Sequence, residues 1–280
     1  MGDQSMRLIG AELLKIRTTS TWWVFGLIML PLWGMAVLYN WGTANLTRNV
    51  DPGADVPADQ AELIRVTKEA VNVASTLYTS GQFLGVLLVM LLGAILVTNE
   101  FFHLTATTTF LTTPRRERVI LAKLSAAVLL GLLFWLVTTV LNLLVVPFVM
   151  RALDLPVLLG DPAVWRAIAL NALAFALWAI LGVGAGVLIR SQLAATLTLS
   201  IAYVIGSFGA ELAFFLLTQY VADWFSKLQV LVPTTASQLM IAGTELPGNP
   251  PRWTGAAILI GYALIMGTVG TLIMKRRDIS

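Results

Sequence analysis

The sequence of 280 residues contains no cysteine and only one histidine, His103. Without thiols, the chain can form no disulfide and offers no thiolate as a nucleophile or metal ligand. A single imidazole cannot build a histidine-rich metal site, so we expect no metal centre. The phosphate-binding pattern G-x-x-x-x-G-K-[ST] is also missing, so the residues themselves do not predict ATP hydrolysis by this chain.

Charged residues are scarce as well, at 12% of the chain against 58% hydrophobic residues. Soluble domains carry about 25% charged residues, so this composition excludes an ordinary soluble domain. The net charge of +3 comes from Lys and Arg that gather beside apolar runs. That pattern orients a membrane protein and does not indicate a nucleic-acid partner. We therefore expect a polytopic helical membrane protein.

Six apolar runs are long enough to cross a bilayer, whose hydrocarbon core of about 30 Å needs roughly 20 helical residues. Because lipid cannot hydrogen-bond to the backbone, each run is expected to be a helix. The fold class is thus all-α, with residues 1–280 forming one transmembrane domain. The expected spans cover residues 22–41, 77–98, 124–150, 167–189, 193–217 and 254–274.

The distribution of Lys and Arg predicts the orientation. These residues are more numerous on the side that holds both termini and residues 99–123 than on the opposite side. Both termini are therefore expected to be cytoplasmic. Because Ala, Leu and Val dominate and Arg outnumbers Lys, as is typical of GC-rich bacterial genomes, the expected location is a bacterial plasma membrane.

Two segments outside the spans have the character of interfacial helices. In residues 6–20 the apolar side chains lie on one helical face, with Glu12, Lys15 and Arg17 on the other, as in an amphipathic helix on the membrane surface. A solvated N-terminal extension is the alternative. Residues 218–253 are too apolar for a solvated loop and too interrupted by prolines for a span, which favours short interfacial or re-entrant helices on the outer side.

Residues 99–123 form a polar, basic island between the second and third spans. Residues 100–110 have the length of a short helix, which Pro114 would end because the residue before proline avoids the helical region. Basic residues then lead into the third span. An ordinary positively charged loop is the alternative interpretation. The basic residues after the proline are Arg115, Arg116 and Arg118.

The same island resembles the cytoplasmic signature of ABC-2-type transporter permeases. The resemblance rests on Glu100-Phe-Phe-His-x-Thr105, on Phe110-Leu111-x-x-Pro114-x-Arg116-x-Arg118-Val, and on Lys123. The N-terminal Ala11-Glu12-Leu13-Leu14-Lys15-x-Arg17 is similar too, and the likeness to the bacterial half-transporter branch covers the whole chain.

The resemblance implies an export permease that works by alternating access on a hydrophobic or amphipathic substrate, such as a drug, a peptide antibiotic or a lipid-like molecule. Its partners would be two cytoplasmic ABC ATPase subunits, which bind ATP and Mg²⁺, and a second permease copy, a homodimer being favoured over a heterodimer. Residues 99–118 would form the coupling helix region. The residues expected to couple to the ATPase are Glu100, His103, Thr105, Arg115, Arg116 and Arg118, with Glu12, Lys15 and Arg17 of the N-terminal helix.

Few polar residues lie inside the spans. Glu211 is ionisable, and an ionisable residue inside a span predicts a place in a substrate pathway or at a dimer interface. Gly206 and Gly209 beside it would allow another helix to approach closely. Asn142 and Asn171 are expected to hydrogen-bond between helices. Two other functions stay open. One is a gradient-driven secondary transporter or channel that uses Glu211, and the other is a membrane scaffold that transports nothing.

Overall fold

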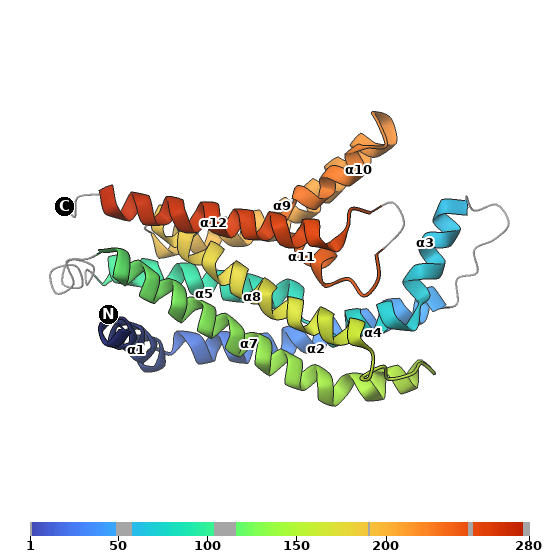
Figure 1. Ribbon diagram of the computed structural model, residues 1–280, viewed down its shortest axis with the longest axis horizontal. Coiled ribbons are helices and arrows are strands. Elements are labelled where there is room, and N and C mark those ends of the chain that lie inside the picture. The colour runs from blue at the N-terminus through green and yellow to red at the C-terminus, as the bar shows by residue number, and fades with distance from the viewer. Residues whose placement is uncertain (1, 49–57, 104–115, 190, 246–248, 277–280) are drawn as a thin grey trace.

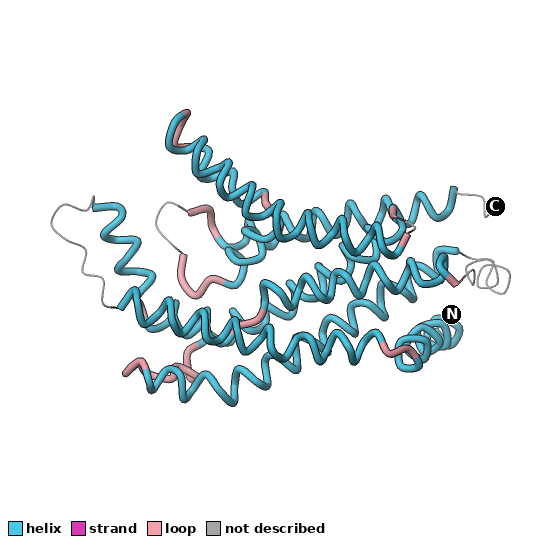
Figure 2. Tube along the Cα trace, turned by 180° about the vertical axis from the view of Figure 1, so that it is seen from behind, coloured by secondary structure: helices cyan, strands magenta, loops and turns pink. Residues whose placement is uncertain are grey.

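The computed structural model describes residues 2–48, 58–103, 116–189, 191–245 and 249–276, and all regular secondary structure within those ranges is helical (Figures 1 and 2). Six helical segments are long and apolar enough to cross a membrane, as the sequence predicts. They are α2 (Thr21–Arg48), α4 (Ala70–Tyr78) together with α5 (Gln82–Phe102), α7 (Arg116–Ala152), α8 (Pro162–Leu188), α9 (Gln192–Tyr220) and α12 (Arg252–Arg276).

Shorter helices lie before and between these segments. The chain begins with α1 (Gly2–Thr18), where the sequence predicts a helix over residues 6–20. The segment between the first and second spans contains α3 (Ala58–Lys68). The outer segment predicted over residues 218–253 contains α10 (Phe225–Leu228), the 3₁₀ helix η1 (Gln229–Leu231) and α11 (Pro233–Ile241).

The long helices lie side by side, and the first helix and the last turns of α12 are at the same end of the bundle (Figure 1). Helix α1 lies across that end. Helices α5 and α8 form the buried centre, whereas α2, α9 and α12 are largely exposed and apolar. The predicted orientation of the termini in a membrane stays a prediction.

Glycines allow α5 and α8 to touch backbone to backbone. A Cβ added at Gly93 would lie 2.6 Å from the carbonyl oxygen of Ala179, and one at Gly186 would lie 2.7 Å from that of Ala94. A Cβ at Gly182 would overlap the carbonyl group of Met90. Small residues permit this kind of approach between membrane helices, where van der Waals packing holds helices together.

The second span is broken near its outer end, where the sequence predicts one continuous helix from about residue 77. Helix α4 ends at Tyr78, and α5 begins after Gly81, whose φ of +89° suits glycine. Asn142 of α7 satisfies the interrupted backbone, because its Nδ2 donates to the carbonyl oxygens of Tyr78 and Ser80 at 3.0 Å each. Its Oδ1 accepts from Trp33 Nε1 at 2.7 Å. The predicted interhelical role of Asn142 is confirmed.

Asn171 behaves differently. It is buried in α8, and its Oδ1 has no hydrogen-bond partner in the described part of the chain. The hydrogen bond between helices that the sequence predicts is therefore not formed by this oxygen with any described residue.

The outer segment folds back into the bundle. Helix α11 is buried against α8 and α12. The hydroxyl of Ser237 accepts from Gln82 Nε2 at 3.4 Å and from Trp178 Nε1 at 3.3 Å. A Cβ at Gly255 of α12 would collide with the carbonyl oxygen of Ala236. These contacts pack α11 into the helical bundle, and its depth in a membrane stays a prediction.

Gly182→Ala is expected to push α8 away from α5 and to destabilise the fold by about 1–3 kcal/mol, the usual cost of overpacking a core. The change is measured as a lower midpoint of thermal unfolding in detergent. Gly206→Ala is the matched control, because no atom lies within 4 Å of the added Cβ. Equal midpoints for the two variants would contradict the close contact.

Candidate functional site

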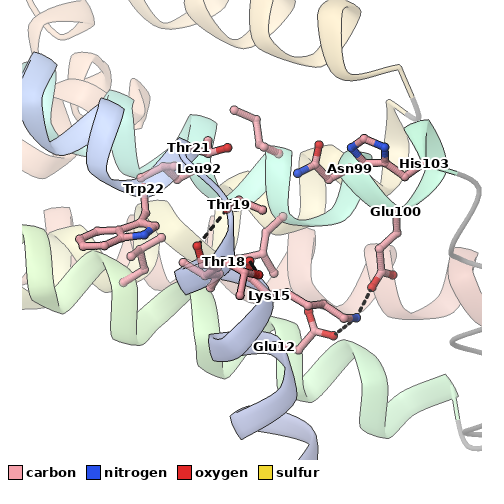
Figure 3. A pocket seen from close by; sticks show the side chains of 14 residues that line it. Glu12, Lys15, Thr18, Thr19, Thr21, Trp22, Leu92, Asn99, Glu100 and His103 are labelled. Carbon is pink, nitrogen blue, oxygen red and sulfur yellow. Dashed lines mark hydrogen bonds and ion pairs between the residues drawn. The ribbon is translucent and has the colours of Figure 1, made fainter.

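Four charged side chains from three helices meet at the end of the bundle that α1 crosses. Glu12 and Lys15 come from α1, Glu100 from the last turn of α5, and Lys123 from the beginning of α7. Three of the four residues are buried, with exposed fractions of 1% for Lys123, 5% for Glu12 and 8% for Glu100. Figure 3 shows the contacts of Lys15 with Glu12 and Glu100. We call these four residues the charge cluster.

Each ammonium group in the charge cluster contacts both carboxylates. Lys123 Nζ lies 2.8 Å from Glu12 Oε2 and 2.8 Å from Glu100 Oε1. Lys15 Nζ lies 2.8 Å from Glu12 Oε1 and 2.7 Å from Glu100 Oε1. The two acids and two bases balance each other in charge, so α1, α5 and α7 are tied together by one electrically neutral network.

Burial and ion pairing shift the pKa of Lys15 in opposite directions. Partial burial lowers the pKa of its ammonium group, but hydrogen bonds and charge attraction from Glu100 and Glu12 outweigh burial and raise the pKa above its usual value. The side chain therefore stays charged at physiological pH and keeps both carboxylates paired.

The orientation of α1 explains how the network forms. Glu12 and Lys15 are three residues apart and share one face of the helix. The face of α1 that packs on the protein is mixed, because Glu12 is buried there and Ile16, one turn later, packs against the hydrophobic core. Leu13 and Leu14 point outward with exposed fractions of 37% and 60%, and Lys15 lies at the edge of the packed face.

Glu100 lies elsewhere than the sequence predicts. The expectation placed it near the start of a separate short helix over residues 100–110. In the structure α5 continues through it and ends at Phe102, with His103 as the C-terminal cap. The reason is that Glu100 points into the bundle and pairs with Lys123, which holds this turn in helical register.

The structure describes only some of the other residues that are predicted to couple to an ATPase. Arg17 and His103 are exposed, and Arg118 is partly buried in the first turns of α7. Arg116 begins α7, but its side chain is not described. Thr105 and Arg115 lie outside the described residues. The charge cluster thus contains three predicted residues, namely Glu12, Lys15 and Glu100.

The predicted intramembrane residues lie apart from the charge cluster. Glu211 is partly exposed on α9 and forms no hydrogen bond or ion pair with another described residue. No atom lies within 4 Å of a Cβ added at Gly206 or Gly209. These three residues therefore lie on a part of α9 that the described chain leaves open.

Lys123 is the site residue that sequence reasoning missed as a member of the cluster. In the sequence it counted as a basic residue flanking the third span and as one residue of the permease-like motif, without an assigned role. One signal was present, because Ala122, Ala126 and Ala127 beside it are small enough for another helix to approach. An acid and a base at the facing ends of consecutive spans, Glu100 and Lys123, could have indicated the pairing.

A cavity of about 460 Å³ adjoins the charge cluster at the elbow where α1 turns into α2. Figure 3 shows Trp22 on one side of this space and Asn99, Glu100 and His103 on the other. Among the described residues, no three His, Asp or Glu side chains gather in a way that could hold a metal ion.

Comparison with known proteins gives no family for the chain. No protein-family model matches it, and a search of curated protein sequences finds no match.

Lys123→Met is expected to destabilise the protein by about 3–5 kcal/mol, because both carboxylates lose a buried partner. The loss is measured as the free energy of unfolding in detergent. Arg17→Met is the control. Arg17 is an exposed residue of α1, and its substitution changes the net charge of the protein by the same amount. If the two variants lose the same stability, Lys123 does not hold the cluster together.

Proposed function

We propose that the chain is the membrane subunit of an ATP-driven exporter, in which separate ATPase subunits act on the end of the bundle that holds the charge cluster. This end is then the cytoplasmic side of a bacterial plasma membrane. The substrate would be hydrophobic or amphipathic, and transport would proceed by alternating access. The observation that carries the proposal is the buried junction of α1, α5 and α7 directly beside the polar island of residues 99–123.

The junction suits the transmission of force. A push on residues between α5 and α7 reaches Glu100 and Lys123 at once, because the two side chains are 2.8 Å apart. Glu12 and Lys15 extend the same connection to α1. The three helices would then move together as a near-rigid unit. In this proposal Glu100 and Glu12 position the helices, while exposed residues such as Arg17 and His103 contact the ATPase.

The ATP and Mg²⁺ would be bound by the partner subunits. The pattern of the polar island supports this division, because its resemblance to ABC-2-type permeases covers the segment that those proteins present to their ATPase. The orientation of α1 adds support. Its outward leucines would rest in the membrane surface, leaving Arg17 at the cytoplasmic side.

A second copy of the chain would complete the translocation path. Helix α9 is exposed along most of its length, and Glu211 lies on it without an ion pair or hydrogen bond to another described residue. A charged residue facing lipid is costly. Contact with a second copy would shield Glu211, and the open positions at Gly206 and Gly209 would allow the two helices to approach closely.

Association with the ATPase is tested by purifying the tagged chain from its native membranes and identifying co-purified proteins by mass spectrometry. A soluble ATPase with a phosphate loop is expected at a fixed ratio. Arg116→Glu should reduce its recovery about tenfold, the effect of roughly 1.4 kcal/mol from reversed charge at an interface.

Lys227→Glu is the matched control, because Lys227 is exposed near the opposite end of the bundle. This substitution should leave the recovery of the ATPase unchanged. Each variant must unfold at the same temperature as the wild type. Purification without any such ATPase, or equal recovery with both variants, would contradict the proposal.

The second copy is tested by chemical cross-linking in membranes. Gly206→Leu should lower the cross-linked dimer fraction, because the added side chain keeps two α9 helices apart. Gly261→Leu on α12 is the control, since that glycine also has no atom within 4 Å of an added Cβ. A dimer fraction that falls equally in both variants, or in neither, argues against α9 as the contact.

A further inference from the structure

The lining of the cavity at the elbow between α1 and α2 changes character along α5. It has a polar wall at the end of this helix, where Asn99 and His103 lie with Lys15 in the lining, and an apolar wall one to two turns earlier, with Leu92, Leu96 and Leu130 of α7. A space with this division fits a molecule that is polar at one end and apolar at the other. Figure 3 shows the elbow, with Trp22 at the beginning of α2 facing the polar residues across the cavity.

Trp22 has a donor without an acceptor. Its indole Nε1 is buried and has no hydrogen-bond partner among the described residues, although the residue lines the cavity. An unsatisfied buried N–H group is costly, and buried tryptophans usually find a partner. The missing acceptor is a specific observation that points to an oxygen atom supplied by a ligand.

Lys15 offers a second donor. Its ammonium group has three N–H bonds, and two are directed at Glu12 and Glu100. The side chain is 49% exposed, so the group remains accessible from the cavity. The charge cluster as a whole is neutral and offers both an ammonium and carboxylates, which suits a headgroup carrying both charges better than a strongly anionic one.

The position of the cavity decides between possible ligands. It lies where the first membrane-spanning helix begins, which is the level of lipid headgroups, and tryptophans are typical of this level. A free phosphate ion would leave the leucine wall without a partner. A hydrocarbon alone would leave the Trp22 N–H group unsatisfied. A phospholipid satisfies both walls.

We propose that the elbow cavity binds one phospholipid with a zwitterionic headgroup, such as phosphatidylethanolamine. The phosphate oxygens accept from Trp22 Nε1 and from Lys15, and one acyl chain lies along Leu92, Leu96 and Leu130. The bound lipid fills the angle between α1 and α2 and supports the elbow next to the charge cluster. The binding belongs to this chain alone and does not depend on the proposed ATPase.

The test is native mass spectrometry of the full-length chain released from nanodiscs of phosphatidylethanolamine. One retained phospholipid is expected per chain. Trp22→Phe removes the donor but keeps the aromatic ring, and it should weaken retention about two- to tenfold, the usual effect of one hydrogen bond. Leu96→Trp should abolish retention by filling the apolar end.

Ile201→Trp is the control. Ile201 is exposed on α9 away from the cavity, and the substitution introduces the same tryptophan side chain as Leu96→Trp. It should retain the lipid. Added dodecyl maltoside and added inorganic phosphate, each alone, should fail to displace the lipid. Displacement by either compound, unchanged retention in Trp22→Phe, or absence of any retained lipid in the wild type overturns the proposal. Should Leu96→Trp fail to fold, Trp22→Phe decides the outcome.

Discussion

The arrangement of helices at one end of the molecule depends on a single buried ammonium group, that of Lys123. A charge with an exposed fraction of 1% is tolerated only when opposite charges contact it directly. Glu12 and Glu100 meet that requirement, and they can do so only if α1 and α5 approach α7 closely. Lys15 completes the balance from the outer edge. Electrostatic compensation thus dictates where three helices meet.

The same requirement explains how α1 packs. The helix must turn Glu12 toward Lys123, and Ile16, one turn later, then packs against the hydrophobic core, while Leu13 and Leu14 point away from the protein. Apolar side chains exposed to water cost about 25 cal/mol per Å². On a membrane surface, where the sequence predicts this helix, the two leucines would meet an apolar environment instead.

The number of spans and their approximate bounds could be predicted because hydrocarbon thickness sets the length of apolar runs. Features that depend on contacts between distant residues could not. The interruption between α4 and α5 is stabilised by Asn142, which lies 64 residues after Tyr78. The place of Glu100 inside α5 depends on Lys123 in the same way. The coupling role of every residue predicted to contact an ATPase stays a prediction, and two of these residues, Thr105 and Arg115, lie outside the described chain.

The glycine contact between α5 and α8 has a mechanical consequence. Where two helices are separated by long side chains, a displacement of one can be absorbed by rotamer changes in between. No side chains separate the two helices at Gly93, Gly182 and Gly186, because the main chains themselves are in contact there. Any displacement of α5 would therefore have to carry α8 with it, and Glu100 lies in the last turn of α5.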